Sequence, residues 1–175
     1  SDHGDNIGER DFWGKSNFYE ESVGIPCIIK GPGIPAGKTL KTPVSLVDVY
    51  PTILKSAGST PEAKPGTSLV DLANAVDDFE RLVFSEYHAV GSPTGAFMIR
   101  KGQWKLIYYV SMQPQLFNLA EDPEELLDLG ADPKHEGIRR QLEGELRSIC
   151  DPEALDAMGK ADQMAIVDAN GGIEA

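Results

Sequence analysis

Residues 96–109 read Ala-Phe-Met-Ile-Arg-Lys-Gly-Gln-Trp-Lys-Leu-Ile-Tyr-Tyr, two apolar runs joined by Lys101-Gly102. Lys-Gly suits a tight hairpin turn, because glycine accepts the positive φ that such turns require. The pattern therefore predicts one strand at 96–100 and a second at 104–109. Two similar runs extend this prediction to an antiparallel sheet of about four strands, at 82–87 and 115–118.

Two helix-start signals follow the sheet. Asp132-Pro133 and Asp151-Pro152 each place an N-cap residue before a proline at the first helical position. After the first signal, apolar residues recur with helical spacing, which predicts a helix that packs one face on the sheet. These residues are Ile138, Leu142, Leu146 and Ile149. The last helix is expected to end near Gly171-Gly172.

The segment before the sheet mixes strand and helix patterns. Short apolar runs predict strands at 25–30 and 39–44, with Cys27 as a packing residue in the first. Asp48 is the expected N-cap of a helix that keeps Pro51 in its first turn and ends at Gly58.

These patterns indicate an α/β fold, α+β for this length of chain. Residues 1–65 are expected to form the end of a large α/β domain. Residues 66–150 are expected to form a small subdomain with a four-stranded antiparallel sheet and a helix, and residues 151–175 a helical tail.

Charge restricts the classes of partner. The net charge is −12, and residues 66–175 carry 20 acidic against 9 basic side chains. Such a surface repels polyanions, so a nucleic-acid partner is not expected. No apolar run reaches the ~20 residues of a membrane span, so no membrane partner is expected either. The compartment is not predicted.

The first residues carry a candidate metal site. Asp2 offers a carboxylate and His3 an imidazole, a mixture that suits Mn²⁺, Mg²⁺ or Zn²⁺ better than Ca²⁺. Adjacent ligands reach one ion only where the chain bends, and Gly4 is expected to permit that bend.

A longer series of motifs follows Asp2-His3-Gly4. The chain resembles the C-terminal part of the sulfatase family of the alkaline-phosphatase superfamily, above all its choline-sulfatase-like and phosphonate-monoester-hydrolase-like branches. The motifs that carry the resemblance cover about 150 residues in the family's order. They include Ser1-Asp2-His3-Gly4, Trp13-Gly14-Lys15, Pro43-Val44-Ser45-Leu46-Val47-Asp48, Pro51-Thr52-Ile53-Leu54, Met98-Ile99-Arg100-Lys101-Gly102, Gln115-Leu116-Phe117-Asn118-Leu119 and Asp122-Pro123.

The resemblance implies roles for four residues. Asp2 and His3 match the family's ligands of a divalent cation, usually Ca²⁺, and a histidine in place of asparagine leaves Mn²⁺ open. Lys15 matches the lysine that contacts the sulfate oxygens. His88 lies where related enzymes approach the mouth of the active site, so a substrate-binding role is open beside that of a surface histidine.

The family's nucleophile is not in this chain. The resemblance implies a formylglycine, made upstream from Cys-x-Pro-x-Arg, and Cys150-Asp151-Pro152 lacks the arginine. The chain is therefore expected to be an inactive C-terminal part of a sulfuric ester hydrolase acting on a small sulfate ester. A phosphonate or phosphate ester hydrolase is the chemical alternative. A non-catalytic binding or oligomerisation module is the other, and a homo-oligomer is left open.

Overall fold

The structure is a computed structural model, and it describes residues 1–60, 64–89 and 92–172. Its contacts divide the chain into two compact units that are interleaved along the sequence. The first unit comprises Ser1–Val83 and Arg100–Trp104, and the second comprises Phe84–Ile99 and the chain from Lys105 onward. The expected domain limits at 65 and 150 stay predictions.

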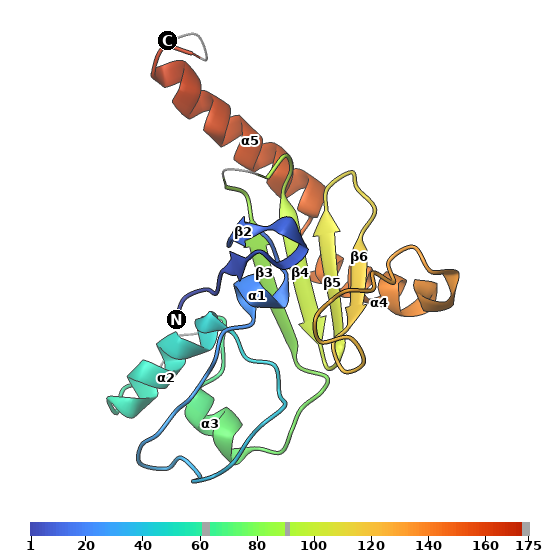
Figure 1. Cartoon of the computed structure of the whole chain (residues 1–175). Helices are drawn as coiled ribbons and strands as arrows, with labels where there is room; N and C mark the ends of the chain where they lie inside the picture. Colours follow the sequence, from blue (N-terminus) through green and yellow to red (C-terminus); the bar gives the residue numbers. More distant parts are fainter. Residues whose placement is uncertain (61–63, 90–91, 173–175) are drawn as a thin grey trace. The chain divides into compact units, whose positions relative to one another are not determined.

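The sheet has the predicted strands. β3 (Leu82–Tyr87), β4 (Ala96–Lys101), β5 (Trp104–Tyr109) and β6 (Gln115–Asn118) lie side by side in chain order (Figure 1). Gly102 has a φ of 54° in the turn between β4 and β5, which is the conformation for which a glycine is needed. Short apolar runs and turn chemistry were enough to place these strands.

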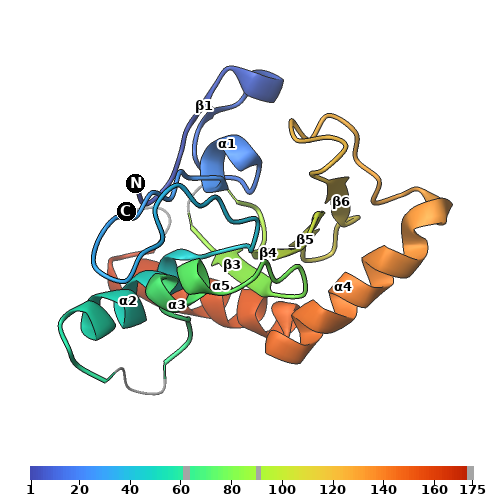
Figure 2. The same cartoon turned by 90° about the horizontal axis from the view of Figure 1, so that it is seen from below.

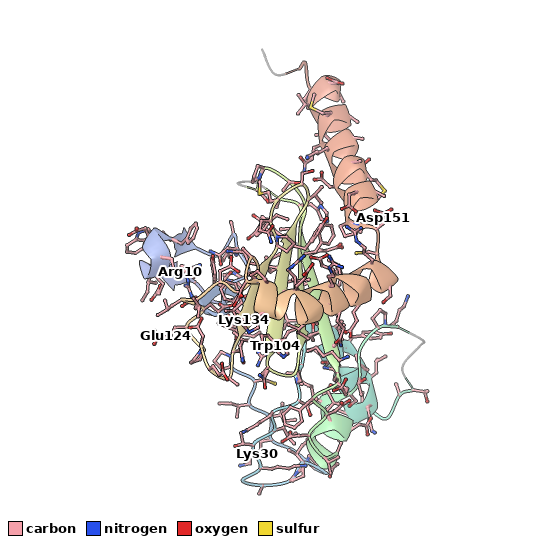
Figure 3. The ribbon with its side chains drawn as sticks, turned by 90° about the vertical axis from the view of Figure 1, so that its right-hand side faces the viewer. Arg10, Lys30, Trp104, Glu124, Lys134 and Asp151 are labelled. Carbon is pink, nitrogen blue, oxygen red and sulfur yellow. The ribbon has the colours of Figure 1, made fainter. Side chains whose placement is uncertain are left out.

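Two helices complete this part of the chain. α4 (Glu136–Ile149) follows a 3-10 turn, η3 (Pro133–His135), and α5 (Pro152–Ala169) follows directly. Asp132 and Asp151 cap the two starts, because their carboxylates accept backbone N–H bonds at 3.0 Å from Lys134 and Ala154. Figure 3 shows α4 crossing one face of the sheet. The large apolar side chains of the sheet and α4 that are at most 1% exposed are Phe97, Ile99, Leu106, Ile107, Leu116, Phe117, Leu142 and Leu146.

A buried carboxylate organises the first unit. Asp48 is 0% exposed and accepts hydrogen bonds from the backbone N–H groups of Ser45 and Thr67, both at 2.8 Å. The guanidinium of Arg81 donates to the same carboxylate at 2.6 Å. A buried charge without such partners would cost several kcal/mol, so these groups fix the chain around Asp48.

Helix α2 (Val49–Ser56) begins and ends where the sequence predicts. Asp48 is the N-cap residue, and Gly58 closes the helix with a φ of 75°. The N–H of Gly58 donates to Lys55 O at 3.1 Å and that of Ser59 to Leu54 O at 2.9 Å, the paired bonds of a Schellman motif. The short helix α3 (Leu69–Asn74) was not predicted, and its start is capped by Ser68.

The two strands expected before α2 are wrong. Residues 25–30 and 39–44 form no strand. Ile28 is 93% exposed, and Cys27 is exposed rather than packed. A buried strand requires a neighbour on each side, and these segments have no sheet partner among the described residues.

Among the residues that the structure describes, no helix is both long enough and apolar enough to cross a membrane.

Candidate functional site

A small hairpin brings the segment that contains Asp2 and His3 close to Lys15. β1 (Asn6–Ile7) pairs antiparallel with β2 (Trp13–Gly14), with Asn6 opposite Gly14. The buried Asn6 amide also donates to Gly14 O at 2.7 Å. In this register the chain before β1 and the chain after β2 run side by side, which brings His3 close to Lys15.

His3 and Lys15 are in direct contact. Lys15 Nζ lies 2.5 Å from His3 Nε2, and His3 Nδ1 lies 2.7 Å from the carbonyl oxygen of Gly4. An ammonium group only donates and a carbonyl only accepts, so Nδ1 carries the imidazole proton and the lone pair of Nε2 accepts from Lys15. This neutral tautomer presents Nε2 as the metal-binding nitrogen.

Asp2 completes the group. Its Oδ2 lies 3.7 Å from His3 Nε2, and its side chain is 83% exposed. A backbone N–H bond lowers the pKa of Asp2 below its usual value, and the positive charge of Lys15 lowers it further. The Asp2 carboxylate is therefore ionised beside His3 Nε2, as a cation ligand must be.

Ser22 holds both arms of this site, and the sequence did not indicate it. Ser22 lies in the helix α1 (Glu20–Val23) and is 2% exposed. Its carbonyl accepts the N–H of Gly4 at 2.8 Å, and its hydroxyl donates to Lys15 O at 2.6 Å. Figure 2 shows the hairpin alongside α1. One buried serine therefore fixes the backbone next to His3 and at Lys15.

Gly4 is needed for a reason other than the expected one. Its φ lies outside the left-handed region, so no special bend depends on it. Instead, a Cβ at this position would lie 2.0 Å from the carbonyl oxygen of Glu21. Glycine is required because the loop passes in contact with the backbone of α1.

Arg10 clamps the hairpin onto α1. Its guanidinium donates to Glu21 at 2.9 Å and lies 4.2 Å from the centre of the Tyr19 ring. Glu9 accepts the N–H of Ile7 at 2.7 Å instead of pairing with Arg10. Figure 3 labels Arg10 in the hairpin. Its role here is to position the site, because its charge is already paired.

The donor set fits part of a divalent-cation site. One carboxylate and one imidazole with its proton anchored on the far nitrogen are ligands suited to Mn²⁺ and related ions. Among the residues described, no group of three or more His, Cys, Asp or Glu side chains is placed to bind a metal. The site as seen supplies two protein ligands.

His88 belongs to the other compact unit and faces a small pocket there. The edge of its ring packs on Phe97, with the ring centres 5.3 Å apart, and its carbonyl accepts from Gln163 at 2.7 Å. The pocket has a volume of ≈ 20 Å³, which is room for about one water molecule. It is lined by His88, Ser92, Thr94, Gly95, Asp156, Gly159, Lys160 and Gln163. The substrate-binding role of His88 stays a prediction.

Cys150 lies at the C-terminal end of α4. Burial raises the pKa of its thiol, and the nearby carboxylates of Glu86 and Asp151 raise it further. A raised pKa disfavours the thiolate, which is the nucleophilic form.

Comparison with known proteins identifies the family. Residues 8–151 match the model of the family described as N-sulphoglucosamine sulphohydrolase, C-terminal. The chain belongs to this sulfatase C-terminal family.

Relatives of this sulfatase C-terminal chain are full-length sulfatases. It is 45% identical over 138 residues to the choline-sulfatase of Rhizobium meliloti (strain 1021), a match over 77% of this chain and 27% of that protein. It is 38% identical over 161 residues to arylsulfatase K of Mus musculus, over 85% of this chain and 29% of the relative. The chain thus spans under a third of the length of these relatives.

The fold of this chain also matches solved structures. The phosphonate monoester hydrolase of Silicibacter pomeroyi superposes with a TM-score of 0.70 at 25% identity, over 83% of this chain and 32% of that chain. A putative sulfatase of Bacteroides thetaiotaomicron matches with a TM-score of 0.70 at 28% identity, over 83% of this chain and 34% of that chain. The mixed fold with a four-stranded sheet is thus shared with both structures, which confirms the predicted fold class.

Proposed function

We propose that this chain is the C-terminal part of a sulfuric ester hydrolase, to which it contributes a cation ligand pair and a sulfate contact. The observation that carries the proposal is the meeting of Asp2, His3 and Lys15. Lys15 Nζ lies 2.5 Å from His3 Nε2, and Asp2 Oδ2 lies 3.7 Å from the same nitrogen. The sulfatase relatives supply the reaction class.

Each of the three residues has a separate role in this proposal. Asp2 and His3 Nε2 hold a divalent cation, Ca²⁺ by family resemblance or Mn²⁺ by the chemistry of the imidazole. The cation, when bound, supplies positive charge that stabilises negative charge on the transferred group. Lys15 contacts a sulfate oxygen through its ammonium group. Gly4, Ser22 and Arg10 position these side chains.

The rest of the site is proposed to lie in the part of the relatives that this chain does not span. A divalent cation takes about six or more ligands, and two come from here. The formylglycine nucleophile implied by the family would also come from that part. We therefore expect the 175-residue chain to hydrolyse no sulfate ester by itself, because two ligands do not make a preorganised site.

Hydrolysis of a phosphonate or phosphate ester is the second candidate. It is supported by the imidazole of His3 at the cation position and by the fold shared with a phosphonate monoester hydrolase. A homo-oligomeric binding module remains the non-catalytic alternative, because the first unit exposes large apolar side chains such as Ile28 and Ile53.

A chimera tests the function. The matching 27% of the Rhizobium meliloti choline-sulfatase is replaced by this chain, and hydrolysis of sulfate esters and of phenylphosphonate esters is compared. We expect sulfate-ester turnover, with His3→Ala and Lys15→Met each lowering kcat/KM by about a hundredfold or more. Lys30→Met is the matched control, because Lys30 is exposed and lies on the loop after α1, away from the hairpin (Figure 3).

The outcome assigns the chemistry. A folded chimera that cleaves only the phosphonate ester would favour the second candidate. A folded and inactive chimera, or turnover that does not change in His3→Ala, would contradict the sulfatase role. Turnover by the isolated chain would contradict the expectation that it is inactive alone.

A further inference from the structure

The lone pair that a metal ion would need is already taken. His3 Nε2 accepts from the ammonium of Lys15 at 2.5 Å, while Nδ1 is held by Gly4 O at 2.7 Å. A neutral imidazole has one lone pair in its plane, so Nε2 cannot bind Lys15 and a metal ion at once.

We propose that Lys15 is a placeholder for the cation: its ammonium occupies His3 Nε2 in the metal-free chain and must leave that nitrogen when a divalent cation binds. This inference rests on the proposed function, because it takes Asp2 and His3 as cation ligands. The new element is that the cation can bind His3 Nε2 only when the Lys15 ammonium leaves that nitrogen.

The surroundings suit such an exchange. The backbone of Lys15 is fixed, because its carbonyl accepts the hydroxyl of Ser22 at 2.6 Å, whereas its side chain is exposed. The ammonium can therefore turn about its own four-carbon stem while the hairpin stays in place. Asp2, 3.7 Å from the same nitrogen, favours either cation at this point.

The exchange links metal binding to anion binding. A dication at His3 Nε2 repels the ammonium, so the released Lys15 becomes available to an anion beside the metal. Linkage is reciprocal, so an anion that binds the released Lys15 must raise the affinity for the metal by the same factor. The structure thus assigns to one lysine both the occupation of His3 Nε2 and the recruitment of the anion.

Nitrogen NMR tests the contact without any metal. The chain has three histidines, so the side-chain nitrogens of His3 can be assigned. We expect Lys15→Met to move the His3 Nε2 resonance toward that of a free unprotonated nitrogen, and Lys30→Met to leave it in place. A His3 Nε2 resonance that is the same in both variants and in the unmodified chain overturns the proposal.

Titration with Mn²⁺ tests the exchange. By calorimetry, Lys15→Met should bind Mn²⁺ about tenfold more tightly than the unmodified chain, a typical size for site-to-site coupling. Lys30→Met should bind as the unmodified chain does. Inorganic sulfate should tighten Mn²⁺ binding in the unmodified chain and have no effect in Lys15→Met.

The results separate this inference from the function on which it rests. If His3→Ala abolishes Mn²⁺ binding but Lys15→Met binds as the unmodified chain does, the ligand role stands and the placeholder is overturned. If neither the chain nor the choline-sulfatase chimera that carries it loses Mn²⁺ or Ca²⁺ affinity in His3→Ala, the ligand role of His3 fails, and the placeholder fails with it.

Discussion

Gly4 shows how much a single residue can depend on its neighbours in space. Its place beside Asp2 and His3 suggested a bend, but the structure gives it an ordinary φ and a backbone in contact with α1. The same motif residue is therefore required by packing rather than by conformation. Ser22 is the counterpart: nothing in the sequence marks it, and yet it joins Gly4 to Lys15.

Substitution at Gly4 should disrupt the site without unfolding the chain. In Gly4→Ala the new Cβ would lie 2.0 Å from Glu21 O, a backbone atom that no side-chain rotation can move. We expect the loop to shift and the Mn²⁺ affinity to fall by more than about tenfold, because a misplacement of ~1 Å already disrupts a coordinated site. Calorimetric titration measures the change.

Gly31→Ala is the matched control. A Cβ at Gly31 meets no atom within 4 Å, so its Mn²⁺ affinity should equal that of the unmodified chain. Equal affinities in Gly4→Ala and Gly31→Ala would show that the close approach to α1 does not hold the ligands.

At the scale of elements, α4, α5 and β5 meet in one ionic cluster. Arg147 of α4 donates to Glu153 of α5 at 2.7 Å and 2.9 Å, and the hydroxyl of Tyr108 in β5 donates to Glu153 at 2.5 Å. The bonds from Arg147, followed by that from Tyr108, lower the pKa of Glu153 to about 2. The charge-assisted bonds between Arg147 and Glu153, which join α4 to α5, have their full strength only while Glu153 is ionised.

Acid should remove this contribution in a defined range. The pKa of Glu153 is lower in the folded chain than its ordinary value of 4.5, so the stabilisation is complete above that value and is lost as the pH falls toward about 2. The side chain of Glu153 is 46% exposed, so solvent screening limits the contribution to about 1 kcal/mol.

Urea unfolding from pH 7 to pH 2 measures this effect. The difference in unfolding free energy between the unmodified chain and Glu153→Gln should be constant near neutral pH and shrink below about 4.5. The difference in unfolding free energy between the unmodified chain and Arg147→Gln should depend on pH in the same way, because this substitution removes the cationic partner of Glu153. A difference that does not vary with pH would exclude the ion pair as its source.

At the scale of the whole molecule, large apolar side chains are exposed in the first unit. Ile28 is 93% exposed, and on α2 Ile53 is 61% and Tyr50 42% exposed. Exposed apolar side chains mark an interaction site where they form a contiguous patch, and we expect these to do so. The chain spans 27% of the choline-sulfatase relative, and the remaining part of such a protein is one partner that could cover it.

Without that partner we expect the chain to self-associate through this surface. Ile28→Lys combined with Ile53→Lys should reduce association in sedimentation velocity while changing the free energy of unfolding by no more than about 0.5 kcal/mol, because both side chains are exposed. Leu126→Lys, at a residue of the second unit that is 72% exposed, is the control. A chain that remains monomeric at all concentrations would contradict this prediction.

Sequence alone determined the parts whose information is local or carried by motifs. The four strands of the sheet, the capped starts at Asp132 and Asp151, and the end of α2 at Gly58 follow from short apolar runs, capping and turn chemistry within a few residues. The family followed from about 150 residues of ordered motifs.

Only the tertiary structure decided which residues meet. Residues 25–30 look like a buried strand, but a strand exists only when a neighbour pairs with it, and the pattern carries no record of that neighbour. In the same way, the contact of Lys15 with His3 arises from the register of the hairpin formed by β1 and β2. The role of Ser22 arises from the contact of this hairpin with α1. Contacts between residues far apart in the chain depend on backbone positions that no local pattern specifies.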